Sequence, residues 1–138
     1  MKLSDRTIDI EKREDGAWVK DPPEWPGLEL KVRGIGNRDW QRLQQKLENA
    51  VPRKRKIDGI FLDPEDRLRI QRILLRDASL LDWRGIEDDE GNPEPFSKEA
   101  ANKYLTEPRY EPFVYAVLWA ANRVADERQD EIEDDAKN

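Results

Sequence analysis

The alternation of apolar and polar positions predicts a small β element near the start of the chain. Residues 28–32, Leu-Glu-Leu-Lys-Val, alternate with a period of two, which is typical of a strand with one buried face. Shorter β-prone runs occur at residues 7–10 and 17–19, and turn-forming residues separate the runs. We therefore predict a β element over about residues 7–34, with Trp18 on its buried face.

From Asn37 onward, the spacing of apolar residues changes to that of amphipathic helices. Asn37 is a suitable N-cap for the first helix, and Pro52 ends it because proline disfavours helical geometry in the residue before it. The apolar residues of this helix recur every three or four positions: Trp40, Leu43, Leu47 and Val51. A longer helix follows, with Asp63 as its N-cap and with Trp83 and Gly85 at its end.

The last third of the chain predicts a small hairpin and two further helices. The hairpin covers residues 86–96, with the polar stretch 88–92 at its tip. Ser97 is a suitable N-cap for a helix over residues 98–106. The final helix, residues 112–125, is apolar on most sides, which is typical of a helix in the middle of a bundle.

These elements fit one domain, since 138 residues is the size of a single ordinary domain. We predict an α+β fold over residues 1–125, in which the small N-terminal β element precedes a mainly helical bundle of about four helices at about residues 37–125. Residues 126–138 carry seven acids and two bases, and we expect this acidic tail to be disordered.

The composition argues against an enzyme. Histidine and cysteine are both absent, which excludes thiolate chemistry, Ser-His-Asp arrangements and histidine-ligated metals. The acidic stretch before Gly91 also fails as a calcium loop, because Ile86 and Ser97 would occupy ligand positions that require carboxylates. A carboxylate-based hydrolase therefore ranks last among the functions considered, and we expect no catalytic site, no cofactor and no bound metal.

A block of basic residues offers an alternative function. Arg53, Lys54, Arg55 and Lys56 follow one another in a chain whose net charge is −6. Such a block is typical of a solvated loop that complements the C-terminus of the preceding helix. It also has the chemistry for phosphate contacts, so a small nucleic-acid-associated regulatory protein is the alternative hypothesis. A dedicated nucleic-acid binder would need a broader basic face.

Two stretches together resemble the tail assembly chaperones of long-tailed bacteriophages. They run in the order Asp15-Gly16-Ala17-Trp18-Val19, Leu30-Lys31-Val32-Arg33, Gly36-Asn37 and the Trp40–Leu47 helix, then Leu80-Leu81-Asp82-Trp83-Arg84-Gly85-Ile86, Asp88–Asn92 and Pro93-Glu94-Pro95-Phe96-Ser97-Lys98-Glu99-Ala100. The resemblance spans about residues 15–106, and its motifs are structural rather than catalytic.

The resemblance implies a chaperone that binds the tape-measure protein and keeps it soluble before the tail tube polymerises. Such a protein acts in the host cytoplasm and is not part of the mature virion. The tail tube protein and further copies of the same chain are additional candidate partners. We expect Trp40, Trp83 and Trp119 to contact the partner, and no membrane association, because the longest apolar run, residues 113–121, is too short to span a bilayer.

Overall fold

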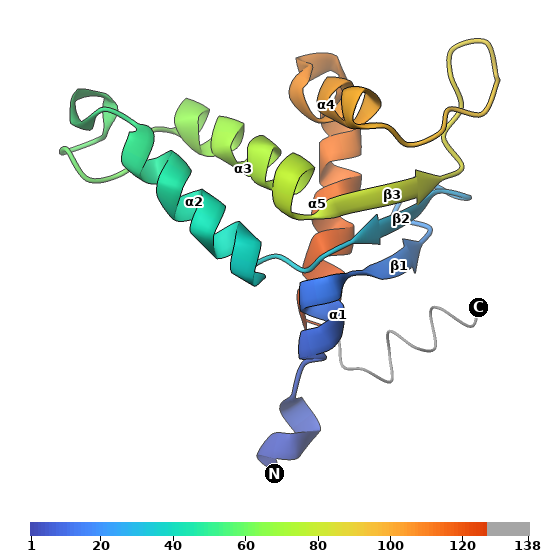
Figure 1. The fold of residues 1–138 in the computed structure, drawn as a ribbon, viewed down its shortest axis with the longest axis horizontal. Coiled ribbons are helices and arrows are strands. Elements are labelled where there is room, and N and C mark those ends of the chain that lie inside the picture. Colours follow the sequence, from blue (N-terminus) through green and yellow to red (C-terminus); the bar gives the residue numbers. More distant parts are fainter. Residues whose placement is uncertain (127–138) are drawn as a thin grey trace.

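An antiparallel sheet is the central element of the fold (Figure 1). The computed structural model describes residues 1–126, and within them the strands are β1 (Ala17–Lys20), β2 (Glu29–Val32) and β3 (Leu80–Arg84), in the order β1-β2-β3. Val19 pairs with Leu30 and Leu30 pairs with Trp83. All three side chains are buried, so they form one core-facing row across the sheet.

Helices cover one face of this sheet, which confirms the predicted α+β class. The α-helices of the described residues are α1 (Ile10–Asp15), α2 (Arg38–Ala50), α3 (Pro64–Ala78), α4 (Lys98–Thr106) and α5 (Glu111–Asp126), and short 3-10 turns cover Leu3–Arg6, Arg53–Arg55 and Pro108–Tyr110. The side chains of Asn37, Asp63 and Ser97 each accept a hydrogen bond from the backbone N–H three residues later, as predicted for N-caps.

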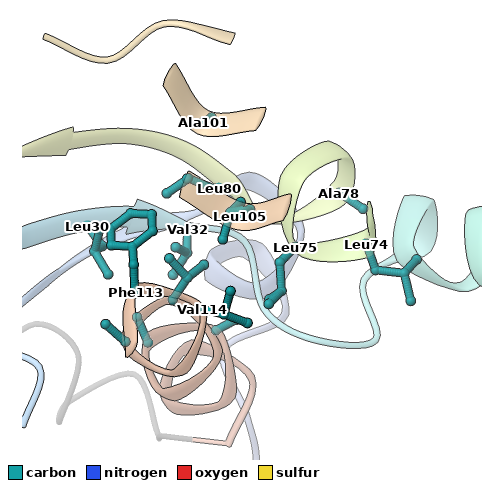
Figure 2. Packing of buried hydrophobic residues seen from close by; sticks show 14 of the residues in the cluster. Leu30, Val32, Leu74, Leu75, Ala78, Leu80, Ala101, Leu105, Phe113 and Val114 are labelled. Atoms are coloured by element: carbon teal, nitrogen blue, oxygen red, sulfur yellow. The ribbon is translucent and has the colours of Figure 1, made fainter. Parts of the chain in front are cut away.

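Helix α5 lies in the middle of the core, as its apolar pattern predicts. Figure 2 shows Leu30 and Val32 of β2 close to Phe113 and Val114 at the start of α5. Further along the helix the fully buried residues are small or β-branched: Val117, Ala120, Ala121 and Val124. These small side chains allow α5 to pack closely against the sheet.

Helices α2 and α3 form an arm that extends away from the sheet (Figure 1). We call α2, α3 and the connecting residues 51–63 the helical arm. The two helices contact each other along the arm, and α3 also contacts α4 and α5 at its base. The loop end of the arm is therefore surrounded by solvent on most sides.

The start of the predicted β element is helical. Residues 7–10 do not pair with a strand; Asp9 instead accepts a hydrogen bond from the Lys12 backbone N–H and caps α1. Trp18 is also placed differently from the prediction, because Ala17 and Val19 point into the core and side chains alternate along a strand. Its ring lies on the other face, 4.0 Å from the Arg84 guanidinium.

The third strand was predicted as the end of a helix. Helix α3 ends at Ala78, and residues Leu80–Arg84 pair with β2. Ser79 makes the change of direction, because its hydroxyl donates to the Arg33 carbonyl and its own carbonyl accepts the Arg33 N–H. The prediction of a hairpin at residues 86–96 is correct, since Glu87 and Pro93 form an antiparallel bridge.

Candidate functional site

The tryptophans predicted to bind a partner lie in three separate places. Trp40 in α2 is 6% exposed and Trp83 in β3 is 3% exposed. The Trp83 indole N–H donates to the Glu94 carbonyl oxygen, and its ring packs against Phe96. Both rings fill the core and offer a partner almost no surface. Trp119 is half-buried on α5, with the Arg123 guanidinium 5.3 Å from its ring centroid.

One residue of the basic block has a structural role. Residues Arg53–Arg55 form a 3-10 turn, and the Arg55 guanidinium lies 3.0 Å from an Oδ1 atom of Asp66. The same carboxylate oxygen pairs with Arg69 at 3.3 Å, and the Asp66 side chain is buried in the first turn of α3. Arg55 therefore ties the loop to α3. Arg53 and Lys54 are exposed, and Lys56 is half-buried.

A tight hairpin follows the basic block at the end of the arm. The Ile57 N–H donates to the Phe61 carbonyl at 2.7 Å, and the Phe61 N–H donates to the Ile57 carbonyl at 3.0 Å. Asp58 and Gly59 both have positive φ, which such a turn requires. Gly59 is also constrained by space, because a Cβ atom there would lie 2.9 Å from Arg53 Nε.

This hairpin displays large apolar side chains to solvent. Ile57 and Phe61 pair directly, which places their side chains on the same face of the hairpin. Ile60 is 68% exposed and Phe61 is 61% exposed, and Ile57 is exposed as well. We call Ile57, Ile60 and Phe61 the tip surface. Sequence analysis missed it because apolar residues beside an Asp-Gly turn are equally typical of a buried hairpin.

A groove runs between the two helices of the arm, next to the tip surface. It encloses about 320 Å³. Its apolar lining residues are Trp40, Leu62, Pro64, Leu68, Ile70 and Leu74. Leu68 is exposed, whereas Ile70 and Leu74 are buried. We call this the arm groove; through it the edge of Trp40 contributes to a surface, although most of its ring is packed.

No group of three or more histidine, cysteine, aspartate or glutamate side chains in residues 1–126 is placed to hold a metal ion. Asp88 in the acidic hairpin instead accepts hydrogen bonds from the backbone N–H groups of Glu90 and Asn92. No helix in this part of the chain has the length and apolar character needed to cross a bilayer.

Comparison with known protein families places the chain among prophage proteins. A family model described as YdaY prophage protein matches residues 35–138. This range includes the helical arm, β3 and helices α4 and α5. No curated protein and no solved structure shows significant similarity to the chain.

Proposed function

Because the chain belongs to the YdaY prophage protein family and is therefore phage-derived, we propose that it is a tail assembly chaperone. In this proposal it binds the tape-measure protein in the host cytoplasm and keeps it soluble before the tail tube polymerises. It is absent from the mature virion. The family match supports the phage origin, and the resemblance to tail assembly chaperones together with the helical arm supports the chaperone activity.

The tip surface is the observation that carries this proposal. Large apolar side chains gathered at one exposed place are typical of a surface that contacts another protein. Ile60 and Phe61 are each more than half exposed at the end of a projecting arm. A protein that keeps an aggregation-prone partner soluble needs such a surface, because it must cover apolar side chains that would otherwise associate with one another.

The arm groove indicates which shape of partner segment fits. Its lining is mostly apolar and lies between two helices, with Gln44, Glu48 and Arg67 among its polar residues. Grooves of this kind accept the apolar face of an amphipathic helix, with anchor residues one turn apart. We therefore propose that a helical segment of the tape-measure protein lies along the groove and reaches the tip surface.

This mode of binding predicts little dependence on salt. Burial of apolar surface is not screened by ions, whereas exposed ion pairs are screened at about 0.5 M salt, where the Debye length is about 4 Å. Replacing Arg53, Lys54 and Lys56 with glutamine is therefore expected to leave the complex intact. A nucleic-acid-associated protein would behave in the opposite way, because phosphate contacts weaken steeply as salt rises.

The direct test is co-expression with the tape-measure protein of the same phage. We expect the wild-type chain to keep that protein in the soluble fraction and to co-purify with it at about 0.5 M salt. The double variant Ile60→Ser with Phe61→Ser is expected to lose both effects. Tyr115→Ser is the matched control, because Tyr115 is 58% exposed on α5, outside the arm. An insoluble partner with the wild-type chain, or full activity of the double variant, contradicts the proposal.

A further inference from the structure

A second hollow lies beside the 86–96 hairpin, and this hairpin lies on the opposite side of the molecule from the loop end of the arm (Figure 1). The hollow encloses about 260 Å³ between the 86–96 hairpin, α4 and the start of α5. Its walls are aromatic: Trp25, Tyr104, Tyr110 and Phe113. The rings support one another edge to face, with centroids 4.7 Å apart for Tyr104 and Tyr110 and 6.0 Å apart for Trp25 and Phe113. We call this the aromatic hollow.

Carboxylates outnumber cations in the lining of the aromatic hollow. The acidic lining residues are Glu87, Asp88, Asp89 and Glu94, and the basic one is Lys103. Glu94 accepts the hydrogen bond of the Tyr104 hydroxyl, and this bond raises the pKa of Tyr104. Glu87 and Asp89 are exposed and form no ion pair within the described residues. Four of the charged lining residues are acidic and one is basic, so the lining of the hollow carries a net negative charge.

Two rings of the hollow already make cation–π contacts with side chains of the same chain. The Lys103 ammonium lies 5.8 Å from the centroid of the Tyr104 ring, and the Arg109 guanidinium lies 4.8 Å from that of Tyr110. Both cationic side chains are exposed, and the volume of the hollow remains beside them. Aromatic faces combined with carboxylates are suited to bind a guanidinium or alkylammonium group.

The loop at the tip of the arm carries basic side chains, which complement the acidic lining of the hollow. Arg53, Lys54 and Lys56 form no ion pair within the described residues, in contrast to Arg55. They lie on the same projecting loop as the exposed Ile57. The loop of the arm and the 86–96 hairpin, which forms one wall of the hollow, lie on opposite sides of the molecule (Figure 1). The loop of one copy can therefore reach a hollow only in a second copy.

We propose that the aromatic hollow of one copy binds the basic tip of a second copy. Arg53 and Lys54 provide the cations, and the carboxylates and rings of the hollow receive them. Because the two contacting surfaces are different and lie on opposite sides of the molecule, the contact is head to tail. The resulting dimer has one free basic tip and one free aromatic hollow. Such a contact generates a chain of copies unless the rotation closes a ring.

The proposed contact between copies does not depend on the proposed chaperone function. The role that we give it, coating a long partner, rests on that function. A chain of copies presents one arm groove after another, which suits the coating of a long helical partner. The two contacts also differ in their physical basis. The contact between copies is mainly electrostatic and weakens with salt, while the contact with the tape-measure protein is mainly apolar.

Two charge-removing variants test the proposal by complementation. The tip variant is Arg53→Gln with Lys54→Gln and Lys56→Gln, and it keeps the structural Arg55. The hollow variant is Glu87→Gln with Asp89→Asn, both exposed positions. The control variant is Glu11→Gln with Glu99→Gln, which removes the same charge from exposed positions outside the hollow lining. Circular dichroism and thermal unfolding verify that all three variants fold like the wild type.

Sedimentation velocity at about 50 mM salt, where the Debye length is about 14 Å, is the measurement. We expect the wild type and the control to grow in sedimentation coefficient with concentration, and both to become monomeric at about 0.5 M salt. Each of the other two variants is expected to associate on the order of tenfold or more weakly. A mixture of the tip variant and the hollow variant should form heterodimers, since one retains its hollow and the other retains its tip, and grow no further.

Three outcomes overturn the proposal. The first is a wild-type chain that stays monomeric at low salt, and the second is a mixture of the two variants that forms no heterodimer. The third is association that survives the hollow variant and is abolished by deletion of residues 127–138, which would identify the acidic tail as the partner of the tip. Solubilisation of the tape-measure protein at about 0.5 M salt is measured with the same variants and is expected to be unchanged, so failure of this proposal and failure of the chaperone function are distinguishable.

Discussion

Substitution of Asn37 by aspartate tests how the arm is joined to the sheet. The Asn37 side chain is fully buried, and its amide nitrogen donates to the carbonyl oxygens of Gly34 at 2.9 Å and Ala78 at 2.7 Å. Its oxygen accepts the Trp40 N–H at 2.9 Å and thereby caps α2. Asn37→Asp retains the shape and the cap, but it places a carboxylate oxygen against two carbonyl oxygens.

The size of the effect follows from these contacts. Each buried acceptor that loses its donor costs about 1–3 kcal/mol. The Ala78 carbonyl loses the Asn37 donor, whereas the Gly34 carbonyl keeps the Asn37 backbone N–H at 3.2 Å. We expect the free energy of unfolding to fall by about 3–5 kcal/mol at pH 7, because the burial of an unpaired charge adds to the lost hydrogen bond. Asn37→Ser is the matched comparison. It keeps a capping oxygen without adding charge, and its loss is expected to be about 1–3 kcal/mol.

Urea unfolding followed by tryptophan fluorescence at pH 7 and at about pH 4 measures both variants. The introduced carboxyl group has an unfavourable charged form in the folded state, so its pKa rises on folding and its protonated form is favoured at low pH. The deficit of Asn37→Asp relative to wild type is therefore expected to shrink as the pH falls, while that of Asn37→Ser stays constant. A deficit of equal size at both pH values, or an aspartate variant as stable as wild type at pH 7, would refute this account.

Further outcomes follow from the core, from Tyr104 and from the C-terminal residues. Leu74→Ala and Val117→Ala are each expected to lower the free energy of unfolding by about 2–4 kcal/mol, because both side chains are almost fully buried; unchanged urea midpoints would contradict the assignment. The hydrogen bond to Glu94 raises the pKa of Tyr104, so the stability that it contributes is present below about pH 10 and is lost as the pH rises further. The free energy of unfolding of Tyr104→Phe is therefore expected to fall less steeply than that of the wild type as the pH is raised above about 10. Deletion of residues 127–138, which lie outside the described part of the chain, is expected to leave the cooperative thermal transition intact, and its collapse would give these residues a structural role.

Helices α2 to α5 were predictable because their signals are local, whereas α1 falls in the predicted β element. Asn37, Asp63 and Ser97 cap α2, α3 and α4 as the sequence predicts, and the apolar pattern of residues 112–125 places α5 in the core. Strand β3 was not predictable in this way. Its residues continue the apolar spacing of α3, and their extended conformation depends on pairing with β2, about fifty residues earlier in the chain.

The candidate site was predictable in part. The basic block marks the loop of the arm from sequence alone, and the structure separates Arg55, which is tied to Asp66, from Arg53 and Lys54, which are exposed. The exposure of an apolar residue is a tertiary property. Trp40 was therefore predicted to contact the partner although it is buried. Phe61 was not predicted to do so although it is exposed.

Site-directed photo-crosslinking tests the central claim most directly, namely that the tip of the arm contacts the tape-measure protein. A photoreactive phenylalanine derivative is placed at position 61 or, as the control, at position 115, where Tyr115 is exposed to a similar extent on α5. After co-expression and irradiation, we expect a covalent adduct with the tape-measure protein from position 61 and little or none from position 115. Equal crosslinking from both positions, or none from position 61 while the two proteins still co-purify, would contradict the assignment of the tip surface.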